Sequence, residues 1–184
     1  LFYFMPYTHS LHRIRIWDLP TRAFHVLLAL CVAGLIATGE IGGSLMQLHF
    51  WLGYAVLVLV LFRLIWGFVG GHWSRFATFV VSPFAALAYL KGKGRPEQSV
   101  GHNPMGSFSV LALLCLLLLQ VFAGMMSDDE ILATGPLVSK VPAEWVTIAT
   151  FLHTEVFKFM LIVLVLLHVA AILWYRFKKQ ENLV

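Results

Sequence analysis

Four long runs of apolar residues limit this chain to a helical membrane protein. They cover residues 23–39, 50–69, 108–126 and 151–175. A bilayer core of about 30 Å is crossed by about 20 residues of helix, and lipid leaves no other way to satisfy the backbone of an open segment. Composition agrees, because 60% of the 184 residues are hydrophobic and only 12% are charged. We therefore predict an all-α membrane protein, a single domain built as a bundle of four transmembrane helices.

Another apolar stretch, "FATFVVSPFAALAYL", lies between the second and third spans. Pro83 and the modest length of this stretch favour a helix that lies at the membrane surface. The first span runs into "GEIGGS" without a small-residue cleavage pattern, so we expect it to stay as a crossing.

The charged residues between the spans predict which ends of the helices face the cytoplasm. Basic residues lie before the first span, between the second and third, and after the fourth: Arg13, Arg15, Arg22, Arg75, Lys91, Lys93, Arg95, Arg176, Lys178 and Lys179. The other two connections carry mainly acidic residues: Glu40, Asp128, Asp129, Glu130 and Glu144, against Lys140. The positive-inside rule then places both termini in the cytoplasm. The formal charge of +4 is explained by anionic lipid headgroups and requires no nucleic acid.

The two cysteines point to no metal or disulfide chemistry. Cys31 and Cys115 lie within predicted spans and outside any C-x-x-C or C-x-x-C-H pattern. The sequence therefore indicates neither a disulfide framework, a zinc ribbon nor a covalently attached haem.

Four histidines lie at span ends, and their depths sort them into two pairs. With the first span entering from the cytoplasm, His25 lies near that face and His49, which opens the second span, lies near the opposite face. The fourth span begins outside, so His153 shares a level with His49, and His168 shares a level with His25. On a regular helix His153 and His168 are about 60° apart in rotation and about 22 Å apart along the axis. One helix face can therefore present both.

A b-type haem explains an imidazole from each of two facing helices at each of two depths. Its iron takes two axial nitrogens from opposite sides of a flat, apolar macrocycle, which a helix bundle can enclose. We therefore predict two non-covalent haems b, with His25, His49, His153 and His168 as iron ligands.

Two other interpretations of these histidines stay open. A histidine at the end of a membrane helix commonly forms hydrogen bonds between helices, which would make this a structural bundle without haem. Zinc would require a third or fourth ligand at one site, and only Glu155 lies near either level.

Arg63 and Gly53 are further candidates for haem binding. Arg63 follows His49 by 14 positions, so it lies about 21 Å deeper, at the level of His25 and His168. Its guanidinium would suit a haem propionate, and the alternative is that it extends to cytoplasmic headgroups. Gly53, one turn after His49, would let a porphyrin approach the backbone, and the alternative is close helix packing.

Four blocks of the sequence are similar to a known family. "WDLPTRAFHVLLAL", "LHFWLGYAVLVLVLFRLIWGFVGG", "GHNPMGSFSVLALL" and "LLHVAAILWY" resemble the bacterial cytochrome b561 family, which also includes the b-type membrane subunits of nickel-iron hydrogenases. The resemblance covers about residues 14–176. It implies a four-helix protein of the bacterial inner membrane with two b haems, one held by His25 with His168 and the other by His49 with His153. These are the pairs that the depths give.

Two features bear on which members the chain resembles. Its length is closer to that of stand-alone or cytochrome-partnered members than to that of the longer hydrogenase subunits. His102 of "GHNPMG" belongs to the family-like pattern but falls in a predicted cytoplasmic loop.

Two stacked haems without a soluble redox domain predict transmembrane electron transfer. The leading hypothesis is transfer between the quinone pool, ubiquinone or menaquinone, and a periplasmic carrier such as a c-type cytochrome. Related small members of the family oxidise superoxide and pass the electron to ubiquinone, but the acidic outer loops disfavour an anionic substrate. A third hypothesis is a membrane anchor that accepts electrons from a hydrogenase or dehydrogenase. A homodimer stays open, because no residue decides it.

Overall fold

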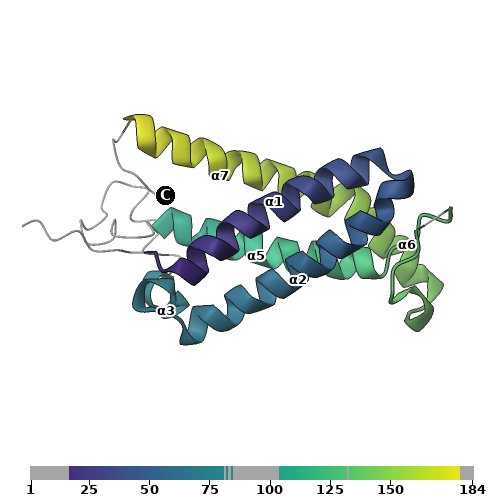
Figure 1. Cartoon of the computed structure of the whole chain (residues 1–184), viewed down its shortest axis with the longest axis horizontal. Coiled ribbons are helices and arrows are strands. Elements are labelled where there is room, and N and C mark those ends of the chain that lie inside the picture. The colour runs from purple at the N-terminus through teal and green to yellow at the C-terminus, as the bar shows by residue number, and fades with distance from the viewer. Residues whose placement is uncertain (1–16, 81, 83, 85–103, 132, 179–184) are drawn as a thin grey trace, which may run out of the picture.

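In the part of the chain that the structure describes, four long helices lie lengthwise beside one another and form a bundle (Figure 1). The structure is a computed structural model, and it describes residues 17–80, 82, 84, 104–131 and 133–178. The long helices are α1 (Leu19–Ile41), α2 (Met46–Val69), α5 (Pro104–Met125) and α7 (Lys158–Lys178). α1 begins and α7 ends at the same end of the bundle, as an even number of crossings requires. The predicted all-α membrane bundle is confirmed.

Among the described residues, four helical stretches are long and apolar enough to cross a membrane, and each is longer than the apolar run that predicted it. They are Leu19–Ile41, Gly43–Val69, Met105–Met125 and Ala143–Lys178. The first begins four residues before the predicted residue 23, because the Asp18 side chain caps it and Pro20 lies in its first turn. Polar capping residues thus extend a helix beyond the part that hydropathy detects.

The fourth crossing consists of three consecutive elements and is the longest, at 36 residues. α6 (Ala143–Phe151) leads into η5 (Leu152–Phe157), which is a π-helix, and η5 leads into α7. Such wider turns are rare and occur frequently at functional sites. This one carries His153.

A tight connection joins α1 to α2. Gly42 and Gly43 have φ of 65° and 55°, values that favour glycine, and η1 (Gly43–Leu45) follows directly. The short turn brings the end of α1, with Glu40, close to the start of α2, with His49.

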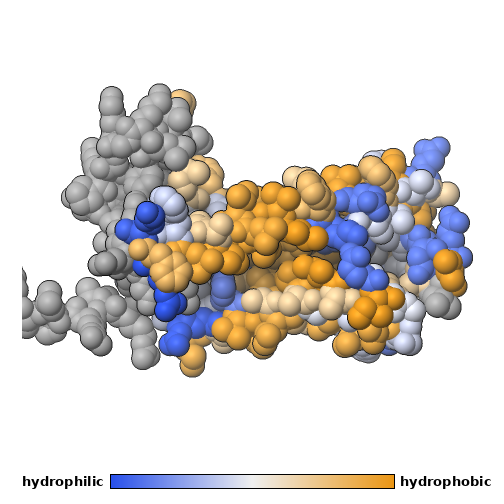
Figure 2. Space-filling view, turned by 90° about the horizontal axis from the view of Figure 1, so that it is seen from above, coloured by the Kyte–Doolittle hydropathy of each residue, from blue (hydrophilic) through white to orange (hydrophobic). Residues whose placement is uncertain are grey.

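The apolar core lies between the long helices, and more apolar side chains cover their outer surface. The buried cluster is Phe24, Val56, Val60, Leu114, Leu116, Leu117 and Leu161. Figure 2 shows apolar side chains over the middle of the molecule and hydrophilic ones towards its two ends. This distribution fits a protein that is surrounded by lipid at mid-height.

A short segment packs under the end of the bundle where α1 begins. It contains η2 (His72–Ser74) and α3 (Phe76–Phe79). α3 is the described start of the stretch that we predict to lie at the membrane surface, and most of the rest of that stretch lies outside the described residues.

Asp18 ties this segment to α1 and α2. Its carboxylate accepts hydrogen bonds from the backbone N–H of Thr21 (2.9 Å), the indole N–H of Trp66 (3.0 Å) and the hydroxyl of Ser74 (3.0 Å). Burial alone would raise the pKa of Asp18, but these hydrogen bonds outweigh it, so the pKa of the carboxyl is lowered from its usual value of 3.8.

We expect the Asp18 hydrogen bonds to stabilise the bundle at neutral pH and to be lost in acid. Because the pKa of Asp18 in the folded state is below that of the unfolded chain, the stabilisation is complete above the unfolded value and disappears as pH falls through the folded one. Asp18→Asn should therefore lower stability at pH 7 by roughly 1 kcal/mol and should flatten the loss of Tm below about pH 4. Thermal unfolding in detergent at a series of pH values measures this. Glu155→Gln, at an exposed position, is the control, and equal pH profiles for Asp18→Asn and the wild type would contradict the prediction.

Candidate functional site

The structure brings the four span-end histidines together as two facing pairs. The ring centres of His25 on α1 and His168 on α7 lie 6.3 Å apart, with 40° between the ring planes. Those of His49 on α2 and His153 on η5 lie 6.1 Å apart, with the planes at 89°. We call these the His25 pair and the His49 pair. Each pair joins two helices, and the fourth crossing contributes to both.

The hydrogen bonds of the His49 pair determine which ring nitrogens are free. His153 Nδ1 lies 2.9 Å from the backbone oxygen of Gln120, which can only accept, so Nδ1 carries the proton. His49 Nδ1 lies 3.1 Å from the hydroxyl oxygen of Thr38. The Thr38 hydroxyl itself donates a hydrogen bond of 2.7 Å to the backbone oxygen of Gly34. His49 Nδ1 therefore donates as well. In both rings Nε2 keeps its lone pair, which is the state of a metal ligand.

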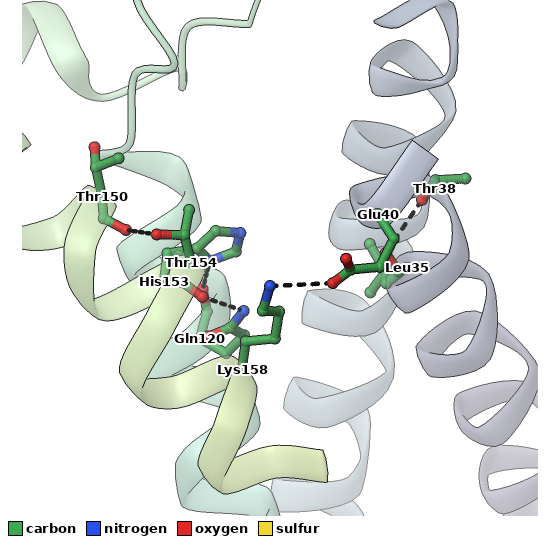
Figure 3. A network of polar contacts seen from close by, with 8 residues as sticks. All are labelled: Leu35, Thr38, Glu40, Gln120, Thr150, His153, Thr154 and Lys158. Carbon is green, nitrogen blue, oxygen red and sulfur yellow. Dashed lines mark hydrogen bonds and ion pairs between the residues drawn. The ribbon is translucent and has the colours of Figure 1, made fainter. Parts of the chain in front are cut away.

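Gln120 holds the π-helical turn in a second way. Its side-chain Nε2 donates a hydrogen bond of 3.1 Å to the backbone oxygen of His153 (Figure 3). Gln120 Oε1 is buried and has no hydrogen-bond partner in the described part of the chain. A buried acceptor without a donor is unusual in a folded protein, and it marks a place that a water or another group would complete.

Two glycines make room for the rings of the His49 pair. A Cβ atom at Gly124 would lie 2.7 Å from Cε1 of His153, and one at Gly39 would lie 3.2 Å from Cε1 of His49. Gly53 differs, because a Cβ there would meet nothing within 4 Å. Gly53 faces open space beside His49, and this open space is part of a cavity.

The cavity lies between all four crossings at the His49 end of the bundle. The walls are mainly apolar and come from α1, α2, α5 and the fourth crossing, as with Val32, Leu35, Phe50, Leu117 and Leu161. Both rings of the His49 pair, Gly53 and Gln120 line it, as do the charged residues Glu40, Asp128, Asp129 and Lys158. A slot with apolar walls and two imidazoles suits a large, flat, apolar cofactor.

Arg63 lies at the other end of the bundle and is only 3% exposed. Its Nη1 donates a hydrogen bond of 3.1 Å to the backbone oxygen of Ser74. The guanidinium carbon lies 5.0 Å from the ring centre of Phe76 and 6.0 Å from that of Phe79. The side chain thus packs under the segment that follows α2, and contact with a propionate stays a prediction.

Among the described residues, the remaining histidine, His72, is not part of either pair. The ring of His72, on η2, packs against Trp73, and His9, His12 and His102 lie outside the described residues. Within the described ranges no group of three or more histidine, cysteine or acidic side chains lies together in a way that could hold a metal ion.

Comparison with known proteins assigns the chain to a family. The family model described as prokaryotic cytochrome b561 matches residues 16–184. The chain belongs to the prokaryotic cytochrome b561 family. The resemblance seen in the sequence is thereby confirmed, and haem b is the cofactor class of this multi-pass membrane protein.

Two curated relatives of this cytochrome b561 family member come from Escherichia coli, strains K12 and O157:H7. Each is named a probable Ni/Fe-hydrogenase 1 B-type cytochrome subunit and is 26% identical over an alignment 142 residues long. The chain spans 60% of the length of these relatives, and the alignment covers 62% of this chain. No solved structure matches the chain with significance.

The spacing of both histidine pairs fits a haem iron between the rings. A metal–imidazole bond is about 2.0 Å long. Ring bonds of about 1.33 Å place each nitrogen about 1.1 Å from the ring centre. Two imidazoles on opposite sides of one iron therefore have centres about 6.2 Å apart by these values, and the pairs of this cytochrome b561 family member have 6.3 Å and 6.1 Å.

Proposed function

We propose that this chain transfers electrons across the bacterial inner membrane, between the quinone pool and a periplasmic electron carrier such as a c-type cytochrome. In this proposal His25 and His168 hold one haem b, and His49 and His153 hold the other. Both termini are cytoplasmic, so the His25 pair lies on the cytoplasmic side. When bound, the haems supply one-electron redox chemistry.

The observation that carries this proposal is the pair of facing imidazoles at each end of one bundle, with nearly equal spacing. A structural bundle has no reason to place its inward histidines at two depths with the same separation. Two redox centres at opposite ends of a bundle give electrons a route across the bilayer.

The side chains around the His49 pair would bind the cofactor, orient it and exclude water. Gln120 and Thr38 fix the ring tautomers, so that Nε2 is the donor atom of each ligand. Apolar residues of α1, α2, α5 and the fourth crossing form the walls. Gly53 leaves room for the porphyrin edge against α2.

Charge supports the orientation and the kind of partner. In the described residues, Arg22, Arg75, Arg176 and Lys178 lie in or beside elements at the His25 end. The connection between α5 and α6 carries Asp128, Asp129 and Glu130 at the other end. Basic residues on the cytoplasmic side follow the positive-inside rule, and acidic residues outside suit a positively charged redox partner.

The test is a haem count followed by electron transfer across a membrane. We expect two non-covalent haems b per chain by the pyridine haemochrome assay. In proteoliposomes with quinol in the membrane and ferricytochrome c on the His49 side only, we expect cytochrome c reduction that His49→Ala abolishes. A haem ratio near zero, or cytochrome c reduction that does not depend on the His49 pair, would reject the proposal.

A second candidate is supported by the names of the relatives. Both are named as subunits of a hydrogenase, so the chain is alternatively a membrane subunit that accepts electrons from a soluble hydrogenase or dehydrogenase. Purification of the tagged chain from its native membrane distinguishes the two functions. A stoichiometric large subunit would favour the second candidate.

Thr38 offers a test of how the His49 pair is held. Thr38→Val keeps the shape of the side chain but removes the acceptor for His49 Nδ1. Partners of metal-bound histidines typically contribute about 10–100-fold to metal affinity, so the haem of this pair should bind roughly tenfold more weakly. Its midpoint potential should rise, because a histidine without this partner is a less basic ligand.

Redox titration of the haem bands in detergent measures the shift caused by Thr38→Val. Thr38→Ser, which keeps the hydroxyl, is the matched control. Equal shifts in the midpoint potentials of both haems in Thr38→Val would contradict the prediction.

A further inference from the structure

Lys158 is the single cation among the described residues that line the cavity at the His49 pair. It begins α7, directly after the π-helical turn that carries His153. In this structure its ammonium lies 3.0 Å from the carboxylate of Glu40 on α1, and Figure 3 shows it reaching across from the fourth crossing to α1.

The acidic residues of the cavity are not equally available to this ammonium. Oδ1 of Asp128 accepts hydrogen bonds from the backbone N–H of Glu130 and the hydroxyl of Thr134. Oδ1 of Asp129 accepts from the backbone N–H groups of Ile131 and Ala133. These carboxylates are held within the loop that carries them, and Glu40 is the acid that Lys158 contacts.

Glu40 and Lys158 form an ion pair that can be exchanged. Their side chains are 60% and 40% exposed, respectively. An ion pair exposed to this extent contributes at most about 1 kcal/mol, so a stronger partner for Lys158 would displace Glu40 at little cost.

A haem b carries two propionates, and an apolar slot has to provide partners for them or leave them in water. A charge-assisted hydrogen bond to a carboxylate is among the stronger polar contacts that a protein can offer, and an unpaired anion beside apolar walls is costly. We propose that Lys158 binds a propionate of the haem at the His49 pair, and that Glu40 holds the ammonium in position until the haem enters. This inference rests on the proposed function, because it requires a haem at that pair.

The competing interpretation is that Lys158 and Glu40 only connect α7 to α1. In that case the two residues are equivalent, because removing either one breaks the same link. If Lys158 binds a propionate, they are not equivalent. Loss of Lys158 then removes a haem contact, whereas loss of Glu40 removes only a competitor for it.

The experiment compares Lys158→Gln with Glu40→Gln, and includes Lys158→Arg, which keeps a cation. The rate at which each purified protein loses haem to an excess of apomyoglobin is followed by absorbance. We expect Lys158→Gln to lose the haem of the His49 pair roughly tenfold faster than the wild type. Glu40→Gln should lose it no faster, and Lys158→Arg should restore most of the retention. Equal acceleration in Lys158→Gln and Glu40→Gln, or none in either, overturns the inference.

A second measurement connects the effect to the propionate itself. Haem-free protein is refilled with haem b or with its dimethyl ester, which has no free carboxylate. The difference between the wild type and Lys158→Gln should vanish with the ester. A difference of the same size with both haems overturns the inference.

Failure of this inference can be told apart from failure of the proposed function. Two haems per wild-type chain, with one lost in His49→Ala, would keep the proposed function whatever Lys158→Gln does. A wild-type chain whose haem content does not change in His49→Ala would overturn both.

Discussion

Alanine at His25 or at His168 is expected to remove the same haem, and alanine at His49 or His153 is expected to remove the other. Each pair has the ring spacing of two ligands on one iron, and a non-covalent b haem that keeps one histidine has lost one of its two coordination bonds to the protein. We expect the haem-to-chain ratio to fall from two to one in each single variant. The reduced-minus-oxidised spectrum should lose one component, identical within a pair and different between pairs.

The control for the histidine variants is His72→Ala. His72 belongs to neither pair, and its ring packs against Trp73, so both haems should remain. Two variants of one pair that lost different spectral components would show that the pairing is wrong. Circular dichroism in detergent checks that each variant keeps its helices.

Gly124→Ala is expected to remove most of the haem bound at the His49 pair, although it changes no ligand. The added methyl group would lie 2.7 Å from Cε1 and 3.0 Å from Nδ1 of His153, closer than atoms that are not bonded to each other approach. The ring cannot turn away freely, because Nδ1 donates to the backbone oxygen of Gln120. A ligand displaced by a fraction of an ångström weakens its metal bond strongly.

Alanine substitutions at two other glycines provide comparisons for Gly124→Ala. A methyl group at Gly39 would lie 3.2 Å from Cε1 of His49, so Gly39→Ala should show a smaller loss. A methyl group at Gly53 would meet nothing within 4 Å, and alanine favours a helix over glycine by roughly 1 kcal/mol. Gly53→Ala should therefore fold at least as well as the wild type but bind the haem of the His49 pair more weakly. The pyridine haemochrome ratio and thermal unfolding of the haem-free protein separate these effects, and unchanged haem content in Gly124→Ala would contradict the prediction.

The sequence predicts the fold well because the bilayer dictates it. In lipid, an open segment satisfies its backbone hydrogen bonds only as a helix, so each long apolar run can only be helical. Four of these runs are present as crossings in the part of the chain that the structure describes. The ends are less predictable. The apolar run of the fourth crossing begins at residue 151, but the helical stretch begins at Ala143, because Pro142 and the mixed sequence that follows start a helix outside the apolar run.

The candidate site was predictable only in part. The four histidines are visible because an ionisable residue in an apolar run is rare, and helix direction gives each one a depth. The partners of the His49 pair are not visible in the same way. Thr38, Gln120 and Gly124 are ordinary residues of apolar helices, and their role depends on how α1 and α5 rotate against their neighbours.

The π-helical turn limits another sequence argument. The rotation of about 60° between His153 and His168 assumes a regular α-helix between them. Leu152–Phe157 is a π-helix instead, so the regular spacing does not apply across it. The Gln120 side chain donates a hydrogen bond to the His153 oxygen within this turn, and sequence periodicity contains neither the turn nor this contact.

If each pair holds a haem, as we propose, the different ring orientations of the two pairs would give the two haems different magnetic properties. An imidazole plane acts mainly on the iron d orbital perpendicular to it. Planes at 89°, as in the His49 pair, therefore act on two orbitals almost equally, whereas planes at 40°, as in the His25 pair, favour one. With the iron oxidised and the rings keeping these angles, the His49 pair should give the more axial electron paramagnetic resonance spectrum and the His25 pair the more rhombic one. The two ends of the electron route would then be distinguishable in a frozen membrane, without mutation and without purification.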